Sequence, residues 1–207
     1  MDRQPGESAR AEYERHREAR MARHRAKFGR LGGLTAALDG ESQLERRWRK
    51  GADGEARIGK RLERSVERAG VIVLHDLRVP GSRANIDHVC VGDGTITVID
   101  AKNYRGKVRV RQGRLWVGGR DRTGLVEGVE RQVDVVRSVL SPGLTADIVG
   151  AIAFADGDRL PLFGRLRVRG VRIDGVRQVA KLAKRRGPRD GASRELLEAI
   201  IRARLSR

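Results

Sequence analysis

Apolar residues between positions 42 and 70 repeat with the period of an α-helix. Five of them fall on one helical face: Leu44, Trp48, Ile58, Leu62 and Val66. Gly51 and Gly54 lie inside this stretch, and because glycine weakens a helix interior they predict a division into two helical pieces. Further helices are predicted over residues 125–140, 176–183 and 194–205.

Runs with the composition of β-strands occupy the middle of the chain. They cover residues 71–77, 86–91, 95–102, 107–118, 148–155 and 168–173. Asp93–Gly94 and Gln112–Gly113 predict hairpin turns, and the run at 148–155 is apolar on both faces, as in a fully buried strand. The order of these helices and strands, with no internal repeat, predicts an α/β domain around a mixed central sheet.

The distribution of charge and glycine predicts three parts: a charged helical or disordered arm and linker (1–40), a core (41–156) and a basic strand/helix extension packed on the core (157–207). The first thirty residues contain nine Lys or Arg and five Asp or Glu, without heptad spacing of apolar residues. They predict a solvated helix or a disordered arm, and Gly32, Gly33 and Gly40 predict a linker after it.

The composition restricts the class of protein. The chain has 207 residues, 45 Lys or Arg, 27 Asp or Glu and a net charge of +18, so a polyanion is the first partner to expect. A single cysteine, Cys90, excludes a disulfide framework and a Cys-rich zinc site. The chain lacks an apolar stretch of membrane-spanning length and a signal-peptide pattern at its start, so we expect a cytoplasmic protein without a membrane span.

The last part of the chain is the most basic. Residues 157–207 contain fifteen Lys or Arg and five Asp or Glu. The candidate nucleic-acid-binding residues there are Lys181, Lys184, Arg185, Arg186 and Arg189. The alternative is a solvated helix end followed by a loop. With 3% aromatic residues, contacts to the phosphate backbone are expected more than extensive base stacking.

Four ionisable residues are candidates for chemistry: Glu55, Asp87, Asp100 and Lys102. Side chains alternate along a strand, so Asp100 and Lys102 share one face, and the Asp93–Gly94 turn folds the strand that contains Asp87 alongside. With Glu55 from a packed helix, these carboxylates would form an oxygen cage suited to Mg²⁺ or Mn²⁺. Such a metal ion beside a lysine fits phosphodiester hydrolysis, whereas a structural ion pair is the simpler alternative.

Three short motifs in this region occur in a specific order and spacing. They are Gly51-x-x-Gly54-Glu55, Asn85-Ile86-Asp87-His88 and Ile99-Asp100-x-Lys102. Together they resemble the nuclease-related domain (NERD), a branch of the PD-(D/E)xK nuclease superfamily, over residues 45–140.

This resemblance implies a restriction-endonuclease-like core and a DNA nuclease that depends on Mg²⁺ or Mn²⁺. Glu55 matches the acidic residue of the family's helix, Asp87 the first motif aspartate, and Asp100 with Lys102 the (D/E)xK element. Gln132 falls where such folds often have a glutamine on the following helix. DNA is the expected partner, with RNA as the second choice.

Other residues near these motifs have both functional and structural interpretations. Tyr104 and Arg105 follow Lys102 and would contact a base or phosphate, or form a solvated turn. His88 and Cys90 are expected to be packed or hydrogen-bonded on the opposite sheet face, since His88 alternates with Asp87, and His75 is expected to have a structural role on the first strand.

Two further function classes stay open at this stage. A non-catalytic module of the same fold would use its charge to bind DNA or RNA, and would depend on Lys184, Arg185 and Arg186. A scaffold or interaction domain would use its basic arms to bind an acidic protein or an anionic membrane surface.

Overall fold

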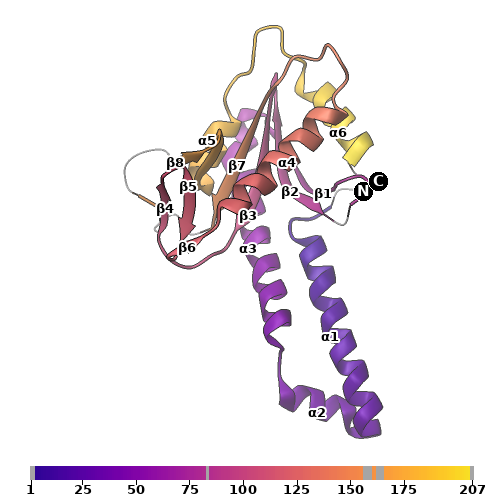
Figure 1. The fold of residues 1–207 in the computed structure, drawn as a ribbon. Helices are drawn as coiled ribbons and strands as arrows, with labels where there is room; N and C mark the ends of the chain where they lie inside the picture. The colour runs from indigo at the N-terminus through magenta and orange to yellow at the C-terminus, as the bar shows by residue number, and fades with distance from the viewer. Residues whose placement is uncertain (1–2, 83, 156–159, 162–165, 206–207) are drawn as a thin grey trace.

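The computed structural model describes residues 3–82, 84–155, 160–161 and 166–205. A six-stranded mixed sheet lies between two layers of helices, and a long helical hairpin projects from one end of it (Figure 1). The predicted α/β class with a mixed central sheet is therefore confirmed, as is the helical nature of the N-terminal arm.

The central sheet has the spatial order β1-β2-β3-β7-β9-β8. Its strands are β1 (Ile72–Arg78), β2 (Asn85–Gly92), β3 (Thr95–Lys102), β7 (Asp147–Phe154), β8 (Leu166–Val168) and β9 (Val171–Gly175). The pairs β3–β7 and β7–β9 are parallel, and the pairs β1–β2, β2–β3 and β8–β9 are antiparallel. Strands β3 and β7, both rich in apolar residues, occupy the centre of the sheet, as expected for strands covered on both faces.

The edge strand predicted at residues 168–173 is wrong in detail. The structure forms a hairpin there, β8 and β9, which turns at Arg169–Gly170. Both turn residues have positive φ, 49° and 86°, the geometry of a two-residue hairpin turn that matches the twist of the flanking strands.

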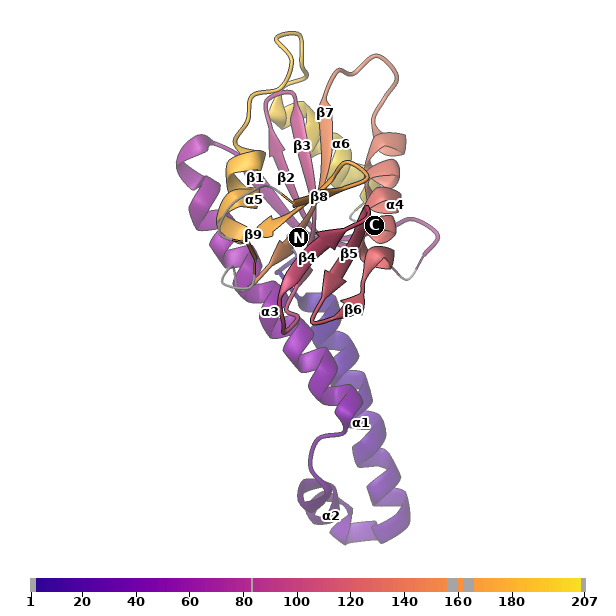
Figure 2. The same cartoon turned by 60° about the vertical axis from the view of Figure 1, so that its left-hand side comes forward.

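A separate three-stranded antiparallel sheet follows β3. It consists of β4 (Val108–Arg111), β5 (Arg114–Val117) and β6 (Arg120–Asp121). The predicted turn at Gln112–Gly113 is confirmed, with φ of 49° and 71°. This small sheet lies beside β8 (Figure 2) and buries Val108, Leu115 and Val117.

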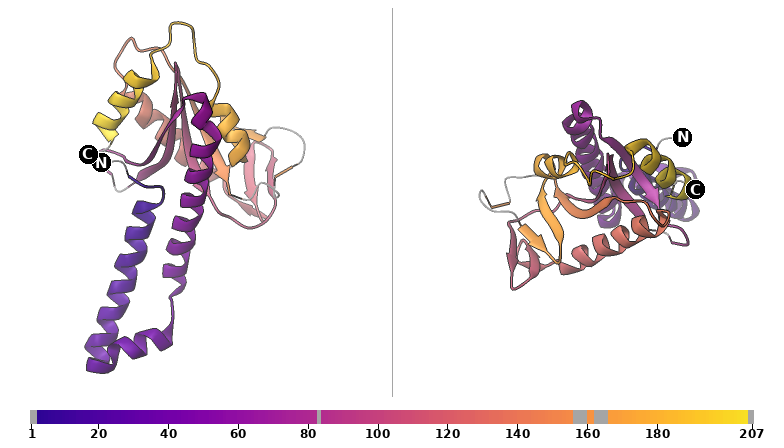
Figure 3. Two further views of the ribbon diagram at one scale, coloured as in Figure 1. Left: turned by 180° about the vertical axis from the view of Figure 1, so that it is seen from behind. Right: turned by 90° about the horizontal axis from the view of Figure 1, so that it is seen from above.

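Helices cover both faces of the central sheet (Figure 3). On one face lie α3 (Gln43–Val66) and α5 (Val176–Ala183), and on the other lie α4 (Thr123–Val139) and α6 (Arg194–Leu205). Ile58 and Leu62 of α3 pack against Cys90 and Ile99 of the sheet. On the other face Leu197 and Ile201 of α6 pack in one cluster with Val89 and Val98.

Helix α3 is continuous, so the predicted division at Gly51 and Gly54 is wrong. Its start is fixed by a capping box in which Ser42 Oγ accepts the Glu45 N–H and Glu45 accepts the Ser42 N–H. The buried apolar stripe of this helix outweighs the cost of its glycines, about 1 kcal/mol each. Gly54 has a packing role, because a Cβ there would approach Asn103 Cβ to 2.6 Å.

The N-terminal arm is the first half of the projecting hairpin. Helix α1 (Glu7–Phe28) lies beside α3, and the two are joined by a 3₁₀ turn, η1 (Gly29–Leu31), and by α2 (Gly32–Asp39) (Figures 1 and 3). The linker predicted around Gly32 and Gly33 is thus wrong, because these glycines begin a helix. A second 3₁₀ turn, η2 (Glu67–Ala69), follows α3.

The packing of α3 makes a quantitative prediction about stability. Leu62 is completely buried against the sheet, so Leu62→Ala leaves a cavity and should lower the free energy of unfolding by about 2–5 kcal/mol. Leu44 lies on the same helix but is 45% exposed, so the matched change Leu44→Ala should stay within about 0.5 kcal/mol. Urea unfolding measures both; equal effects would contradict this assignment of the core.

Candidate catalytic site

Two of the predicted aspartates meet at one end of the β2–β3 pair. His88 pairs with Ile99, and continuing this antiparallel register by one residue places Asp87 opposite Asp100. Asp87 Oδ2 accepts the backbone N–H of Ala101 at 2.7 Å, which fixes its carboxylate beside the end of β3.

Lys102 lies next to these carboxylates. Its Nζ donates to Asp100 Oδ1 at 2.7 Å and to the carbonyl of Ala101 at 3.2 Å. Both side chains of the ion pair are largely buried. The structure therefore brings Asp87, Asp100 and Lys102 together, as their spacing predicts.

Glu55 approaches the same end of the sheet from α3. The close contact between Gly54 and Asn103 holds this part of the helix against the loop after β3. Glu55 Oε1 accepts the Gly6 N–H at 3.1 Å, and burial together with the charge of Asp87 raises the pKa of Glu55. Glu55 is thus an electrostatic neighbour of the aspartates and is bonded to the N-terminal segment.

The carboxylates share an environment that disfavours negative charge. Burial, together with the charge of Asp100, raises the pKa of Asp87 to about 7. Burial, with Asp87 and Asp76 nearby, raises the pKa of Glu55 to about 8. Burial alone lowers the pKa of Lys102, but the carboxylates of Asp100 and Asp87 outweigh it, so its pKa is raised and the ammonium stays charged.

These residues fit a divalent cation. Asp100 Oδ2 is buried and has no hydrogen-bond partner among the described residues, although Oδ1 is bonded to Lys102. A buried carboxylate oxygen of this kind is costly unless a proton or a cation satisfies it. Within the described part of the chain, no three His, Cys, Asp or Glu side chains form a ready-made ligand set. Water or phosphate oxygens would therefore have to complete the coordination, as is usual for Mg²⁺.

Gln132 lies on α4 next to the start of β2. Its Nε2 donates to the carbonyl of Asn85 at 3.5 Å, a weak bond two residues before Asp87. Its Oε1 is buried without a partner among the described residues. The structure thus places Gln132 beside the strand that contains Asp87, and its Oε1 can still accept a hydrogen bond.

Asp76 and the first residues of the chain are features that the sequence analysis missed. Asp76 is buried with a positive φ of 52°, and its carboxylate accepts the N–H of Ser8 at 3.0 Å and the hydroxyl of Ser8 at 2.7 Å. Asn85 Nδ2 also donates to it at 3.0 Å. Ser8 and Asp76 are 68 residues apart, so no local motif signals this contact.

His88 and Cys90 lie on the α3 face, as expected, and His75 lies beside them. His75 Nδ1 and His88 Nδ1 are 2.9 Å apart, and His75 Nε2 contacts Glu63 Oε1 at 2.9 Å. Burial, with His75 adjacent, keeps the pKa of His88 well below its usual value, so this imidazole is neutral. Burial raises the pKa of Cys90 to about 12 and leaves an unreactive thiol in the core.

The predicted nucleic-acid-binding residues fall in two places. Tyr104 and Arg105 lie in the loop that follows Lys102. Tyr104 is half-buried, and the Arg122 guanidinium lies 5.2 Å from the centre of its ring, whereas Arg105 is exposed. The other predicted residues are exposed at the far end of α5 and in the loop after it: Lys181, Lys184, Arg185, Arg186 and Arg189.

That basic loop packs on the opposite end of β2 and β3. The Gly187 N–H donates to the carbonyl of Asp93 at 3.1 Å, in the turn that precedes β3. Six residues of extended strand, from Thr95 to Asp100, separate this turn from the carboxylates, roughly 20 Å. The structure therefore does not bring the basic loop to the candidate site.

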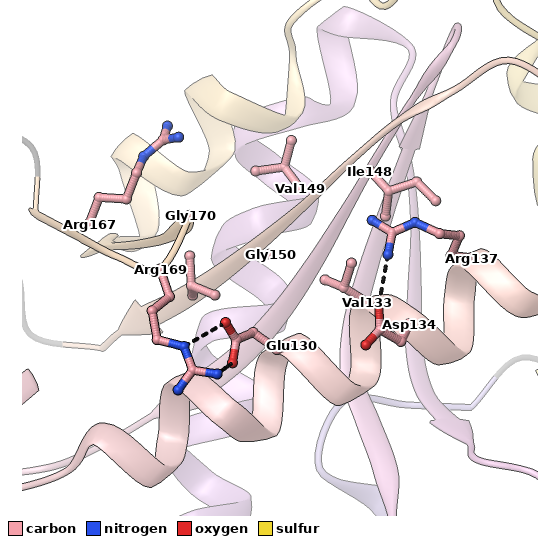
Figure 4. Close-up of a pocket in the computed structure, with 11 residues that line it drawn as sticks. Glu130, Val133, Asp134, Arg137, Ile148, Val149, Gly150, Arg167, Arg169 and Gly170 are labelled. Carbon is pink, nitrogen blue, oxygen red and sulfur yellow. Dashed lines mark hydrogen bonds and ion pairs between the residues drawn. The ribbon is translucent and has the colours of Figure 1, made fainter. Parts of the chain in front are cut away.

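Two grooves among the described residues bear on the candidate site. One of about 570 Å³ is bounded by α4, β7 and the β8–β9 hairpin, and two of its three arginines are paired with carboxylates, Arg169 with Glu130 and Arg137 with Asp134 (Figure 4). Gln132 of the same helix bonds toward β2 instead, and neither Asp87 nor Asp100 lines this groove.

The second groove, about 690 Å³, lies on the small sheet. It is lined by Lys107, Arg109, Arg111, Gln112, Trp116, Gly118 and Gly119. None of these residues is among the binding residues predicted from the sequence. The alternation of arginine with valine in β4 was the available signal, because Val108 is buried and Arg109 is exposed.

A family model described as the nuclease-related domain, NERD, matches residues 50–155, just over half of the chain. This protein belongs to the NERD family. The matched segment contains Glu55, Asp87, Asp100, Lys102 and Gln132, and membership indicates a nuclease-related function and interaction with nucleic acid in general. Searches of curated proteins and of solved structures found no match.

None of the helices in the described residues has the length and apolar content required to cross a membrane.

The raised pKa values predict how stability depends on pH. A carboxyl whose native pKa exceeds its unfolded value stabilises the fold at low pH and loses that contribution as pH rises through the native pKa. Without divalent ions, stability should therefore fall between pH 5 and pH 8, and Asp87→Asn should raise the melting temperature at pH 8 by roughly 2–4 °C or more.

The control for this experiment is Asp134→Asn, which removes an exposed aspartate of α4. It should leave the pH dependence unchanged. A wild-type protein whose stability is flat over this range, or an Asp87→Asn protein that is less stable at pH 8, would contradict the assignment.

Proposed function

We propose that this NERD protein is a metal-dependent nuclease that hydrolyses phosphodiester bonds of DNA at the site formed by Asp87, Asp100 and Lys102, with Glu55 beside them. The main support is the buried arrangement at the end of β3. Two carboxylates are paired across β2 and β3, an ammonium is bonded to one of them, and one Asp100 oxygen has no partner among the described residues. A buried carboxylate oxygen in this position is available to a cation, which supports the metal-dependent interpretation over a structural ion pair.

Asp87 and Asp100 would bind Mg²⁺ or Mn²⁺, and Glu55 would bind it directly or through water. A divalent cation at such a site polarises a phosphate oxygen and lowers the pKa of a bound water. Burial and the repulsion between the carboxylates raise the pKa values of Glu55 and Asp87 to near neutral pH. A divalent cation would replace the bound protons and relieve the repulsion, so the site favours a cation.

Lys102 would act on the reacting phosphate. Its raised pKa keeps it cationic, and its bond to Asp100 points the ammonium at the carboxylate end of β3. From there Nζ would orient the attacking water or stabilise negative charge that develops on the phosphate oxygens. Gln132, whose side-chain oxygen has no partner in the described part of the chain and lies beside the start of β2, would support the alignment of water or substrate.

The groove of the small sheet would position the DNA. Arg109 pairs with Trp116 across β4 and β5, and Arg111 pairs with Arg114, so cations and an indole share one face. Like charges opposite one another are unfavourable unless an anion lies between them. Among the described residues Arg114 forms an ion pair with Asp121, and no such pair is seen for Arg109 or Arg111. Phosphates contacting the arginines with a base stacked on Trp116 would suit this surface.

The proposal is tested by cleavage of labelled DNA with Mg²⁺, Mn²⁺ or EDTA, using duplex, single-stranded, flap and junction substrates. Lys102→Met and Asp100→Asn should each reduce metal-dependent cleavage by at least about a hundredfold. Their affinity for DNA, measured without divalent ions, should stay within a few-fold of wild type. Lys60→Met, which removes an exposed lysine of α3, serves as the matched control and should cut normally.

The outcomes separate the function classes. Loss of cleavage in Lys102→Met with normal cleavage in Lys60→Met supports catalysis at this site. If the wild type cuts none of the substrates but shifts them in a salt-dependent manner, the protein is a binding module and the catalytic proposal fails. Cleavage that persists in EDTA would exclude the metal-dependent mechanism.

The position of the DNA-binding surface gives a separate prediction. The double change Arg109→Gln/Arg111→Gln should weaken DNA binding and reduce the slope of log Kd against log salt by about 2. Trp116→Leu should weaken binding of single strands more than of duplex. The comparison variant is Lys184→Gln/Arg185→Gln, at the other end of the sheet; if it causes the larger loss, the loop after α5 is the binding surface instead.

A further inference from the structure

The end of the helical hairpin exposes an unusual amount of apolar surface. The large apolar side chains exposed in the described residues are Phe28, Leu31, Leu34, Leu38, Leu44 and Leu196. The first four lie together where α1 turns through η1 into α2, and we refer to them as the hairpin tip. Clustered exposed apolar residues of this kind mark an interaction surface more often than single ones do.

Helix α2 buries its small residues and exposes its large apolar ones, the reverse of an ordinary amphipathic helix. Its small residues face the protein: Ala36 is completely buried, and a Cβ on Gly32 would approach Arg25 Cα to 2.5 Å. Its leucines face solvent, Leu34 at 62% and Leu38 at 80% exposure. A helix that served only to close the hairpin would bury its leucines, so these side chains are not explained by internal packing.

Polar contacts hold α2 in this orientation. Arg20 of α1 donates from Nη1 to the carbonyl of Ala36 at 2.5 Å and from Nε to Glu45 of α3 at 2.9 Å. His24 of α1 contacts Thr35 at 3.1 Å. Because α2 is bonded to α1, and Arg20 of α1 is also bonded to α3, the leucines are presented outward by a defined structure.

The surroundings of the hairpin tip are strongly cationic. Residues 19–38 contain five Lys or Arg and no Asp or Glu. Arg20 is bonded to Glu45, whereas the other four are exposed around the leucines: Arg23, Arg25, Lys27 and Arg30. A second copy of the chain would bring like charges together at this surface, so the charge favours an anionic partner.

We propose that the hairpin tip docks the protein on the surface of an anionic lipid bilayer. Leu31, Leu34 and Leu38 enter the boundary between headgroups and acyl chains, and the four exposed cations contact lipid phosphates. The tip is the far end of a projecting hairpin, which suits a deformable planar surface (Figures 1 and 3). Nucleic acid would match the charge but would leave the leucines in water.

Docking by the tip would leave the carboxylate site accessible. Helix α1 runs from Ser8, which is bonded to Asp76, to Phe28 at the tip, and its twenty-residue rise is roughly 30 Å. The catalytic end of the sheet would stand at about that distance from the bilayer. The docking proposal itself does not depend on nuclease activity, since it concerns binding alone.

The test is flotation of the full chain with vesicles of phosphatidylcholine alone or of phosphatidylcholine with phosphatidylglycerol. The wild type should bind the anionic vesicles and not the neutral ones. Leu31→Ser/Leu34→Ser/Leu38→Ser should reduce the partition coefficient by about tenfold or more. Because these side chains are exposed, the urea midpoint should not change, which separates lost docking from lost folding. Leu196→Ser, 46% exposed on α6, is the matched control and should bind as the wild type does.

A second variant tests the electrostatic part. Arg23→Gln/Arg25→Gln/Lys27→Gln/Arg30→Gln should also lose binding, and raising the salt concentration should weaken the wild type. Binding that is equal on neutral vesicles, absent altogether, or unaffected by the leucine changes overturns the proposal. The proposal also fails if the wild type sediments as a dimer and the leucine changes dissociate it. It fails likewise if the leucine changes reduce the affinity for DNA and leave the affinity for lipid unchanged.

Discussion

Burial of β3 between two helical layers is the constraint on which the candidate site depends. The strand pairs with β2 on one side and β7 on the other, so its end cannot move away to let water solvate Asp100. The antiparallel register then brings Asp87 to the same place, and two carboxylates share a volume with little solvent. Their raised pKa values, the charged Lys102 and the unsatisfied Asp100 oxygen all follow from this one arrangement.

The positive charge of the chain lies on at least two separate surfaces, which are the loop after α5 and the groove of the small sheet. The loop after α5 lies at the turn end of β3, whereas the groove of the small sheet lies beyond its carboxylate end. Only the second continues from the segment that contains Lys102. The net charge therefore indicates a polyanion as partner, whereas the arrangement of the sheet determines which cationic side chains lie near Asp87, Asp100 and Lys102.

The N-terminal segment connects the hairpin with the site. Gly6 donates to Glu55 and Ser8 to Asp76, so the start of α1 is bonded to one residue of the proposed site and to an aspartate whose charge acts on that residue. At its other end the same helix carries the exposed leucines of the hairpin tip. One rigid element thus spans the distance between the proposed docking surface and the proposed catalytic surface.

The sequence by itself determined the class of fold, the position of most strands and helices, and the grouping of Asp87, Asp100 and Lys102, because strand alternation and a two-residue turn act locally. It did not reveal that α3 is continuous or that Gly32 begins a helix, since those outcomes depend on close packing against Asn103 and Arg25. The bonding of Asp76 to Ser8, the distance of the basic loop from the site and the outward leucines were decided only by the tertiary structure. Each of these joins residues far apart in the chain, and local periodicity contains no information about such contacts.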